Sequence, residues 1–280
     1  MLCSKMKWRN HDIGVCDWSI RPKGMRDLVH RVDELGLSHV QLAMGPLIDL
    51  PEDRRRDEVA IFRDSGLAAT AAQISFVGED YSSISSIERT AGVVPTALWP
   101  QRLERCRRAV EIAAELNIDL ITLHLGFVPQ SNDPAYEPVL TRVCEIAKPA
   151  SALGVSILLE TGQETASELL QFFNDVRCQS VDANYDPANF LMYGVGDPLD
   201  AVAVLSRHIR HVHLKDAVLS DHPGTEWGKE TPLGQGQVPI PQILEALDEV
   251  EYQGPLVIER EYDESLEGIR AAIEFISTIP

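Results

Sequence analysis

Four ionisable residues stand at or near the ends of apolar segments in the second half of the chain. They follow the letters LL, NY, HV and VI and are Glu160, Asp186, His213 and Glu259. A carboxylate at the inner end of a hydrophobic strand is costly unless it is paired or bound to a metal. Three carboxylates that converge with one imidazole need a cation to neutralise them. Such oxygen-rich ligation with one nitrogen suits Mn²⁺, Mg²⁺ or Co²⁺ better than structural zinc.

The structural alternative for these residues is a buried charge network that ties the strands together. We favour the metal site, because buried unpaired charge rarely serves stability. The sequence therefore predicts one divalent ion. Mn²⁺ is the first expectation, and Mg²⁺, Co²⁺ and Zn²⁺ remain alternatives.

Further residues at strand ends are candidates for contact with a substrate. His124 has two interpretations of equal weight, a core histidine bonded to the backbone or a substrate contact. Lys215 could bind a substrate oxygen, or it could pair with Asp216 or Glu259. Trp18 could form an apolar wall of a sugar pocket, although packing is the more common role of a tryptophan.

Three further features favour a structural role. Trp227 has the same two interpretations as Trp18. His211 has the inward parity of His213 but lies deeper in the strand, so we expect it in the core. The stretch Gly234–Gly236 is similar to a phosphate-cradling loop, yet a GxG in a loop usually marks only a tight turn.

The elements that must position these residues are eight short apolar runs that alternate with amphipathic helical segments. The runs span residues 12–19, 38–44, 67–76, 118–125, 154–160, 179–186, 209–215 and 255–261. Gly36, Gly66 and Gly154 are natural ends for the preceding helices. The alternation predicts a parallel sheet covered by helices, an α/β fold. Eight units favour a closed (β/α)8 TIM barrel over an open doubly wound sheet, since no GxGxxG follows the first strand.

Two segments outside the strands carry their own expectations. The stretch 77–100 is too long for a simple connection, and it predicts a lid or a dimer contact. The helix that follows has an apolar stripe, and Arg102, Arg105 and Arg108 fall on its other face. That arginine cluster predicts a solvated surface.

Composition limits the functions that remain. The 280 residues are 44% hydrophobic and show no linker, which predicts one domain spanning 1–280. A net charge of −18 makes nucleic acid an unsuitable partner. Five scattered cysteines without a CxxC pair predict a reducing compartment. With no leader-like or membrane-spanning apolar stretch in the sequence, the expected location is the cytoplasm.

Five motifs in this order resemble the xylose isomerase-like TIM-barrel superfamily of sugar phosphate isomerases and epimerases. They are LLET, NYDPANF, HVHLKD, LGQGQVPIPQILEAL and GPLVIERE. The resemblance implies that Glu160, Asp186, His213 and Glu259 coordinate the metal. It also implies that Glu160 and Glu259 are the acid/base pair. Asn189 stands where ketose 3-epimerases of this superfamily carry a histidine, so we expect Asn189, together with Lys215, to contact the substrate.

The resemblance implies a metal-dependent isomerase or epimerase of a sugar or sugar-like hydroxy-ketone, acting by proton transfer through an enediolate. A dehydratase of a ketocyclitol-like substrate is the main alternative. An apurinic-site endonuclease and a non-catalytic sugar-binding protein are less favoured. Barrels of this kind often form homodimers or tetramers through their helices and the long third loop.

Overall fold

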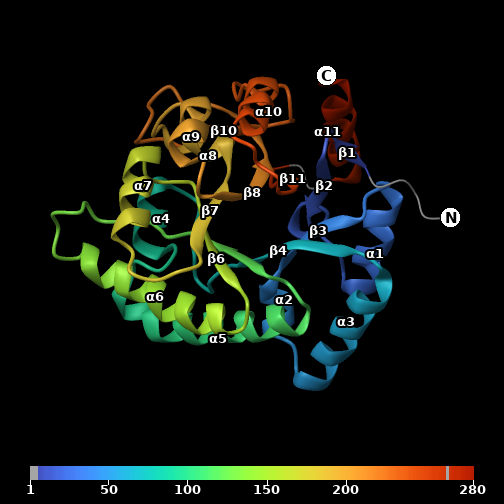
Figure 1. The fold of residues 1–280 in the computed structure, drawn as a ribbon, viewed down its shortest axis with the longest axis horizontal. Coiled ribbons are helices and arrows are strands. Elements are labelled where there is room, and N and C mark those ends of the chain that lie inside the picture. Colours follow the sequence, from blue (N-terminus) through green and yellow to red (C-terminus); the bar gives the residue numbers. More distant parts are fainter. Residues whose placement is uncertain (1–5, 263–264) are drawn as a thin grey trace.

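Eight parallel strands form a closed barrel in the computed structural model, which describes residues 6–262 and 265–280 (Figure 1). The barrel strands are β2 (His11–Cys16), β3 (His39–Ala43), β4 (Ala68–Ile74), β5 (Leu120–Leu123), β6 (Ser156–Glu160), β7 (Val181–Tyr185), β8 (Ile209–Leu214) and β11 (Leu256–Ile258). Each pairs in parallel with its neighbours, and β2 closes the ring by pairing with both β3 and β11. The predicted single (β/α)8 barrel is confirmed, because every predicted run overlaps one barrel strand.

Helices follow the strands and surround the barrel. They are α1 (Met25–Glu34), α2 (Met44–Ile48), α3 (Glu52–Ser65), α4 (Ile84–Thr90), α5 (Trp99–Glu115), α6 (Tyr136–Ala152), α7 (Ala166–Asp175), α8 (Pro187–Tyr193), α9 (Pro198–Leu205), α10 (Ile240–Glu249) and α11 (Leu266–Thr278). Three short strands stand outside the barrel: β1 (Lys7–Trp8), β9 (Asp216–Val218) and β10 (Lys229–Thr231). Strand β1 pairs antiparallel with β2, and β9 with β10.

Local sequence signals explain where several helices end. Gly66 takes the left-handed conformation, with φ 77°, directly after α3, and Gly36 and Gly154 also have positive φ. A residue with a side chain is strained at such angles, so glycine lets the chain turn from helix to strand. Among the residues that the structure describes, no helix is both long and apolar enough to cross a membrane.

The segment before α5 corrects one expectation. Arg102 is buried, at 3% exposure, and donates hydrogen bonds to the backbone carbonyls of Gly92 and Thr90. The prediction of a solvated surface is therefore wrong for Arg102. Helical periodicity identifies a polar face but not what covers it, and here residues 77–98 fold back over the helix and supply carbonyl acceptors. Arg105 is also engaged, through Asp49.

Candidate metal centre

Four neighbouring strands bring the predicted ligand residues together. Glu160 is the last residue of β6, Asp186 follows β7, His213 lies in β8 and Glu259 follows β11. These strands are adjacent in the order β11, β8, β7, β6. All four side chains are buried, and one ligand atom from each lies within 4.8 Å of the others. The carboxyl end of the barrel thus assembles three carboxylates and one imidazole at a single point.

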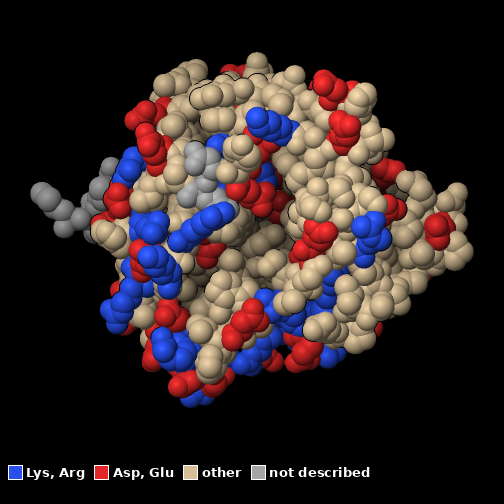
Figure 2. Space-filling view, turned by 180° about the vertical axis from the view of Figure 1, so that it is seen from behind, with Lys and Arg blue, Asp and Glu red and all other residues tan. Residues whose placement is uncertain are grey.

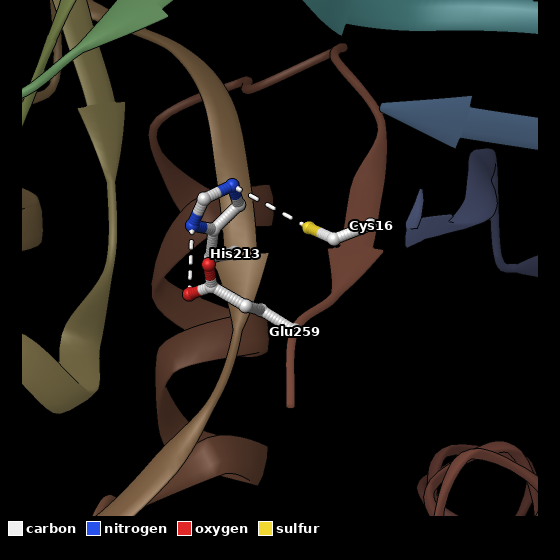
Figure 3. A group of neighbouring side chains, drawn as sticks. All are labelled: Cys16, His213 and Glu259. Atoms are coloured by element: carbon white, nitrogen blue, oxygen red, sulfur yellow. Dashed lines mark hydrogen bonds and ion pairs between the residues drawn. The ribbon is translucent and has the colours of Figure 1, made fainter. Parts of the chain in front are cut away.

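The imidazole of His213 faces the carboxylates with its Nδ1 atom. This atom lies 3.2 Å from Glu259 Oε2, 3.7 Å from Glu160 Oε1 and 3.9 Å from Asp186 Oδ2. Figure 3 shows the ring between Glu259 on one side and Cys16 on the other. Burial raises the pKa of the Cys16 thiol well above its ordinary value, and its sulfur lies on the Nε2 side of the ring, 3.9 Å from that atom.

Two buried polar atoms of this group have no hydrogen-bond partner among the described residues: Asp186 Oδ2 and His213 Nδ1. The other carboxylate oxygen of Asp186 is used, since it accepts from the backbone N–H of Ala188 at 2.8 Å. Unsatisfied buried polar atoms are costly, and each one in a native fold calls for an explanation. A divalent cation among these oxygens and this nitrogen would supply the missing interactions, so the donor set fits a metal ion.

Buried polar residues of other barrel strands orient His213 and Glu160 through hydrogen bonds. Gln41, fully buried in β3, places its Oε1 2.6 Å from His213 Nε2, and its Nε2 donates to Thr122 Oγ1 at 2.8 Å. Accepting the Nε2 proton leaves Nδ1 as the ring atom that faces the carboxylates, and Nδ1 could bind a cation once its own proton is displaced. Asn184 donates to Glu160 Oε2 at 3.1 Å.

The expected substrate-binding residues lie beside the four predicted metal ligands. Three of them donate hydrogen bonds to the carboxylate of Glu160 or Glu259. Asn189 donates to Glu160 Oε1 at 3.2 Å, and Trp18 Nε1 donates to Glu259 Oε1 at 2.9 Å. Lys215 Nζ donates to Glu259 Oε2 at 3.0 Å. Of the pairings predicted for Lys215, the structure shows the one with Glu259, because the Asp216 carboxylate is occupied by backbone N–H groups.

The charges of these residues depend on one another. Burial opposes ionisation of Glu259, but Lys215 and His213 outweigh it and hold the Glu259 pKa well below its usual range. Burial raises the pKa of Asp186 to about 6, although Lys215 lowers it. Burial likewise opposes protonation of His213, yet Glu259 and Glu160 raise the pKa of its imidazole well above the ordinary value. A cation that binds here therefore displaces a proton from His213.

Comparison with known proteins shows the family of this chain. Residues 29–279 match the xylose isomerase-like TIM barrel family. The chain belongs to this family. A solved xylose isomerase domain protein from Planctomyces limnophilus is 32% identical, with 90% of each chain covered and a TM-score of 0.83.

Two further proteins are less similar to this chain. A family protein from Mycobacterium smegmatis, solved in complex with magnesium, is 19% identical over 97% of each chain, with a TM-score of 0.74. Inosose dehydratase from Yersinia enterocolitica is 28% identical over 156 residues, which cover 49% of this chain and 52% of the relative. The matched region thus spans about half the length of this curated relative.

The xylose isomerase-like barrel opens above the four ligand residues into a cavity of about 460 Å³. His124 lines it, with Nε2 3.6 Å from Glu160 Oε1, beside Trp18 and Trp227. Figure 2 shows acidic side chains inside a central hollow on the face drawn there. Sequence reasoning missed several lining residues, among them Tyr81 and Tyr193, which lie outside the strands, where no strand periodicity marks them.

Two other expectations are settled by hydrogen bonds. The amides of Gly234 and Gly236 donate to Asp216 Oδ2 at 2.9 and 2.8 Å, and a Cβ on Gly236 would lie 2.1 Å from Asp216 Oδ1. The phosphate-cradle interpretation of Gly234–Gly236 is wrong, because the chain's own carboxylate fills that turn. His211 is buried and contacts Asn184 Oδ1 at 2.8 Å, so its core position is confirmed.

Proposed function

We propose that this protein is a divalent-metal-dependent isomerase or epimerase of a sugar or sugar-like hydroxy-ketone. The observation that carries the proposal is the meeting of Glu160, Asp186, His213 and Glu259 within 4.8 Å, with two buried atoms left unsatisfied. The cavity beside them, of about 460 Å³, has room for a molecule of sugar size.

Glu160 and Glu259 are the proposed acid/base pair. They reach the cavity from β6 and β11, on either side of His213. Glu259 is held by Trp18 on one oxygen and by Lys215 on the other, which keeps it ionised and fixed in place. We assign removal of the substrate proton to one glutamate and its return to the other. Return to the same carbon from the opposite face gives an epimer, and return to the neighbouring carbon gives an isomer.

The same four ligand residues would hold the cation, and Mn²⁺ is the proposed ion. When bound, such an ion polarises a carbonyl oxygen and stabilises the negative charge that follows proton removal. The family protein solved with magnesium supports a divalent ion in this fold. His124 lies near Glu160, and we assign it to hydrogen bonding with a hydroxyl group of the substrate.

A dehydratase is the second candidate, and the similarity to inosose dehydratases favours it. Removal of the first proton is common to both reactions, so one of Glu160 and Glu259 remains the base. The reactions differ in the next step: the other glutamate would give its proton to the hydroxyl on the neighbouring carbon, which leaves as water, instead of returning a proton to carbon.

The test follows solvent deuterium into ketose and ketocyclitol substrates by NMR, with Mn²⁺-loaded wild-type protein, Glu160→Gln and Glu259→Gln. Metal content is measured for each variant, so that loss of the ion is separated from loss of the base. We expect exchange in the wild type and its loss in both variants. Full exchange by both variants would contradict the assignment. An epimer or isomer in the product supports the first candidate, and a dehydrated product supports the second.

The setting of this activity is also a proposal. We assign a small-molecule substrate and no nucleic acid, because of the net charge of −18. The cysteines without CxxC pairs support a cytoplasmic location. Residues 77–100 carry Tyr81 to the cavity, which supports their assignment as a lid; a contact in a homodimer or tetramer is the other assignment for this segment.

A further inference from the structure

We propose that the cavity selects an uncharged polyhydroxy ketone and rejects phosphorylated or carboxylated analogues. This inference rests on the proposed function and names the charge class of its substrate. The charged groups that line the cavity carry it. Among the described lining residues, four are carboxylates, one is a lysine and one is a histidine: Glu79, Glu160, Glu259, Glu261, Lys215 and His124. Burial lowers the pKa of His124, but Glu160 and the other three carboxylates together raise it above its ordinary value.

The lysine is already committed to carboxylates. Lys215 is 3% exposed, and its Nζ lies 2.6 Å from Glu261 Oε2, 3.0 Å from Glu259 Oε2 and 3.9 Å from Asp186 Oδ2. An anionic group that paired with Lys215 would have to take it from these partners and would leave their charges uncompensated in a buried place. Lys215 is therefore paired with the carboxylates of the site and is not available to neutralise the negative charge of a ligand.

Two arginines near the cavity are not among the described residues that line it. Arg105 donates to Asp49 Oδ1 and to the Ser75 carbonyl, each at 2.8 Å. Arg260 is buried with its Nη1 3.6 Å from Glu230 Oε1, and it is not among the lining residues. The Gly234 and Gly236 amides, which could have received an anion, already bind Asp216.

What the cavity does offer suits a neutral polyol. Tyr81, Tyr193 and Trp227 form an aromatic wall, with ring centroids 5.3 Å apart for Tyr193 and Trp227 and 6.3 Å apart for Tyr81 and Trp227. Trp227 Nε1 and His124 Nδ1 are buried without a hydrogen-bond partner among the described residues. Both can bond to a hydroxyl group. Aromatic faces with a few placed polar atoms fit the apolar and hydroxyl faces of a sugar or cyclitol.

The test compares matched substrates on Mn²⁺-loaded protein. One pair is D-fructose and D-fructose 6-phosphate, and the other is an inosose and the carboxylated hydroxy-ketone 3-dehydroshikimate. Solvent deuterium exchange is followed for each. We expect the neutral member to exchange at least about 100-fold faster, since juxtaposed like charges are strongly unfavourable. Equal or faster exchange of the anionic members would overturn the inference and leave the proposed function standing.

Failure of the proposed function gives a different result, which is no exchange with any of the compounds. Binding of the same pairs, measured by calorimetry, then decides the inference by itself. Tighter binding of the neutral members supports it. Tighter binding of the anionic members, or no binding of any compound, overturns it.

A charge variant locates the source of the selectivity. Glu261→Gln removes one partner of Lys215, and we expect the preference for neutral over anionic substrates to fall about tenfold. The control is Glu111→Gln, which removes the same charge from the outer surface of α5 and should leave the preference unchanged. An unchanged preference in Glu261→Gln would contradict the assignment to the Lys215 group.

Discussion

Two buried aspartates near the mouth of the barrel have opposite surroundings. Asp216 is 1% exposed, and both of its oxygens are satisfied by backbone N–H groups, from Ala217 and Val238 on one and from Gly234 and Gly236 on the other. Asp186 is fully buried, yet its Oδ2 has no hydrogen-bond partner among the described residues. The nearest cationic atoms, His213 Nδ1 and Lys215 Nζ, are both 3.9 Å away.

This difference separates a structural carboxylate from one prepared for a ligand. The four N–H groups around Asp216 compensate its desolvation and fix the turn at Gly234–Gly236. The desolvation of Asp186 is compensated only in part, because its Oδ1 accepts a backbone hydrogen bond while its Oδ2 has no hydrogen-bond partner among the described residues. A buried carboxylate without enough hydrogen-bond or ion-pair partners lowers the stability of the fold, and a bound cation would restore that stability.

The largest expected effect is at Asp186. Asp186→Asn removes the charge of one proposed metal ligand. Loss of a residue that only supports a ligand lowers metal affinity about 10–100-fold, and we expect the Mn²⁺ affinity of Asp186→Asn to fall by more than that. The unfolding free energy of the metal-free protein should stay the same or rise, because the under-compensated charge is gone. Calorimetric titration and metal-free denaturation measure the two effects. Unchanged Mn²⁺ affinity would break the distinction between the two aspartates.

Asp216→Asn is the matched isosteric control and should have the reverse profile. The NH₂ group of the asparagine side chain cannot accept the hydrogen bonds that the carboxylate oxygen in its place accepts from backbone N–H groups. Those buried N–H donors therefore lose their partner. We expect the unfolding free energy to fall by about 2–4 kcal/mol. Mn²⁺ affinity should change less than it does in Asp186→Asn. Equal loss of metal affinity in the two variants would show that the mouth of the barrel responds as one unit.

A smaller effect is expected from the residue that orients His213. Gln41→Met removes the acceptor of the Nε2 proton, and we expect Mn²⁺ affinity to fall about 10–100-fold. Gln41→Glu keeps an acceptor oxygen and should retain more affinity than Gln41→Met. Nitrogen chemical shifts of the imidazole report which ring atom carries the proton in each variant. Equal affinity of wild type and Gln41→Met would exclude the orienting role.

The smallest effect concerns a third buried acid near the barrel mouth. Burial raises the pKa of Glu164 to about 8. The folded state then binds more protons than the unfolded state between the ordinary carboxyl pKa and about 8, so this group lowers stability as pH rises through that window. Glu164→Gln should therefore stabilise the protein more at pH 8 than at pH 5, by chemical denaturation. A pH-independent difference would show that Glu164 is ionised in the fold and that burial without a cation does not neutralise an acid here.

The sequence predicts the barrel and the ligand residues for one physical reason. Parallel buried strands are short apolar runs, and a charged residue at the end of such a run stands out, as Glu160 and Glu259 do. Because the carboxyl ends of all barrel strands meet, the four residues could be expected to converge. Gln41 could also have been found, since it is a polar residue within the apolar run SHVQLAM.

The wall of the cavity and the coverage of helices could not be predicted in this way. Tyr81 and Tyr193 reach the cavity from segments without strand periodicity, so their direction depends on the folded path of the chain. Arg102 lies on the polar face of α5, but burial of that face depends on residues 77–98, which no local pattern places. The glycines at 234 and 236 match an anion-binding turn in sequence, and only the fold shows that Asp216 occupies it.

The central claim is that Glu160, Asp186, His213 and Glu259 hold one divalent cation. The most direct measurement is anomalous X-ray diffraction from crystals of the protein grown with Mn²⁺. We expect one strong anomalous peak about 2.0–2.6 Å from an oxygen of each carboxylate and from Nδ1 of His213. A peak elsewhere in the molecule, or no peak at a saturating Mn²⁺ concentration, would contradict it.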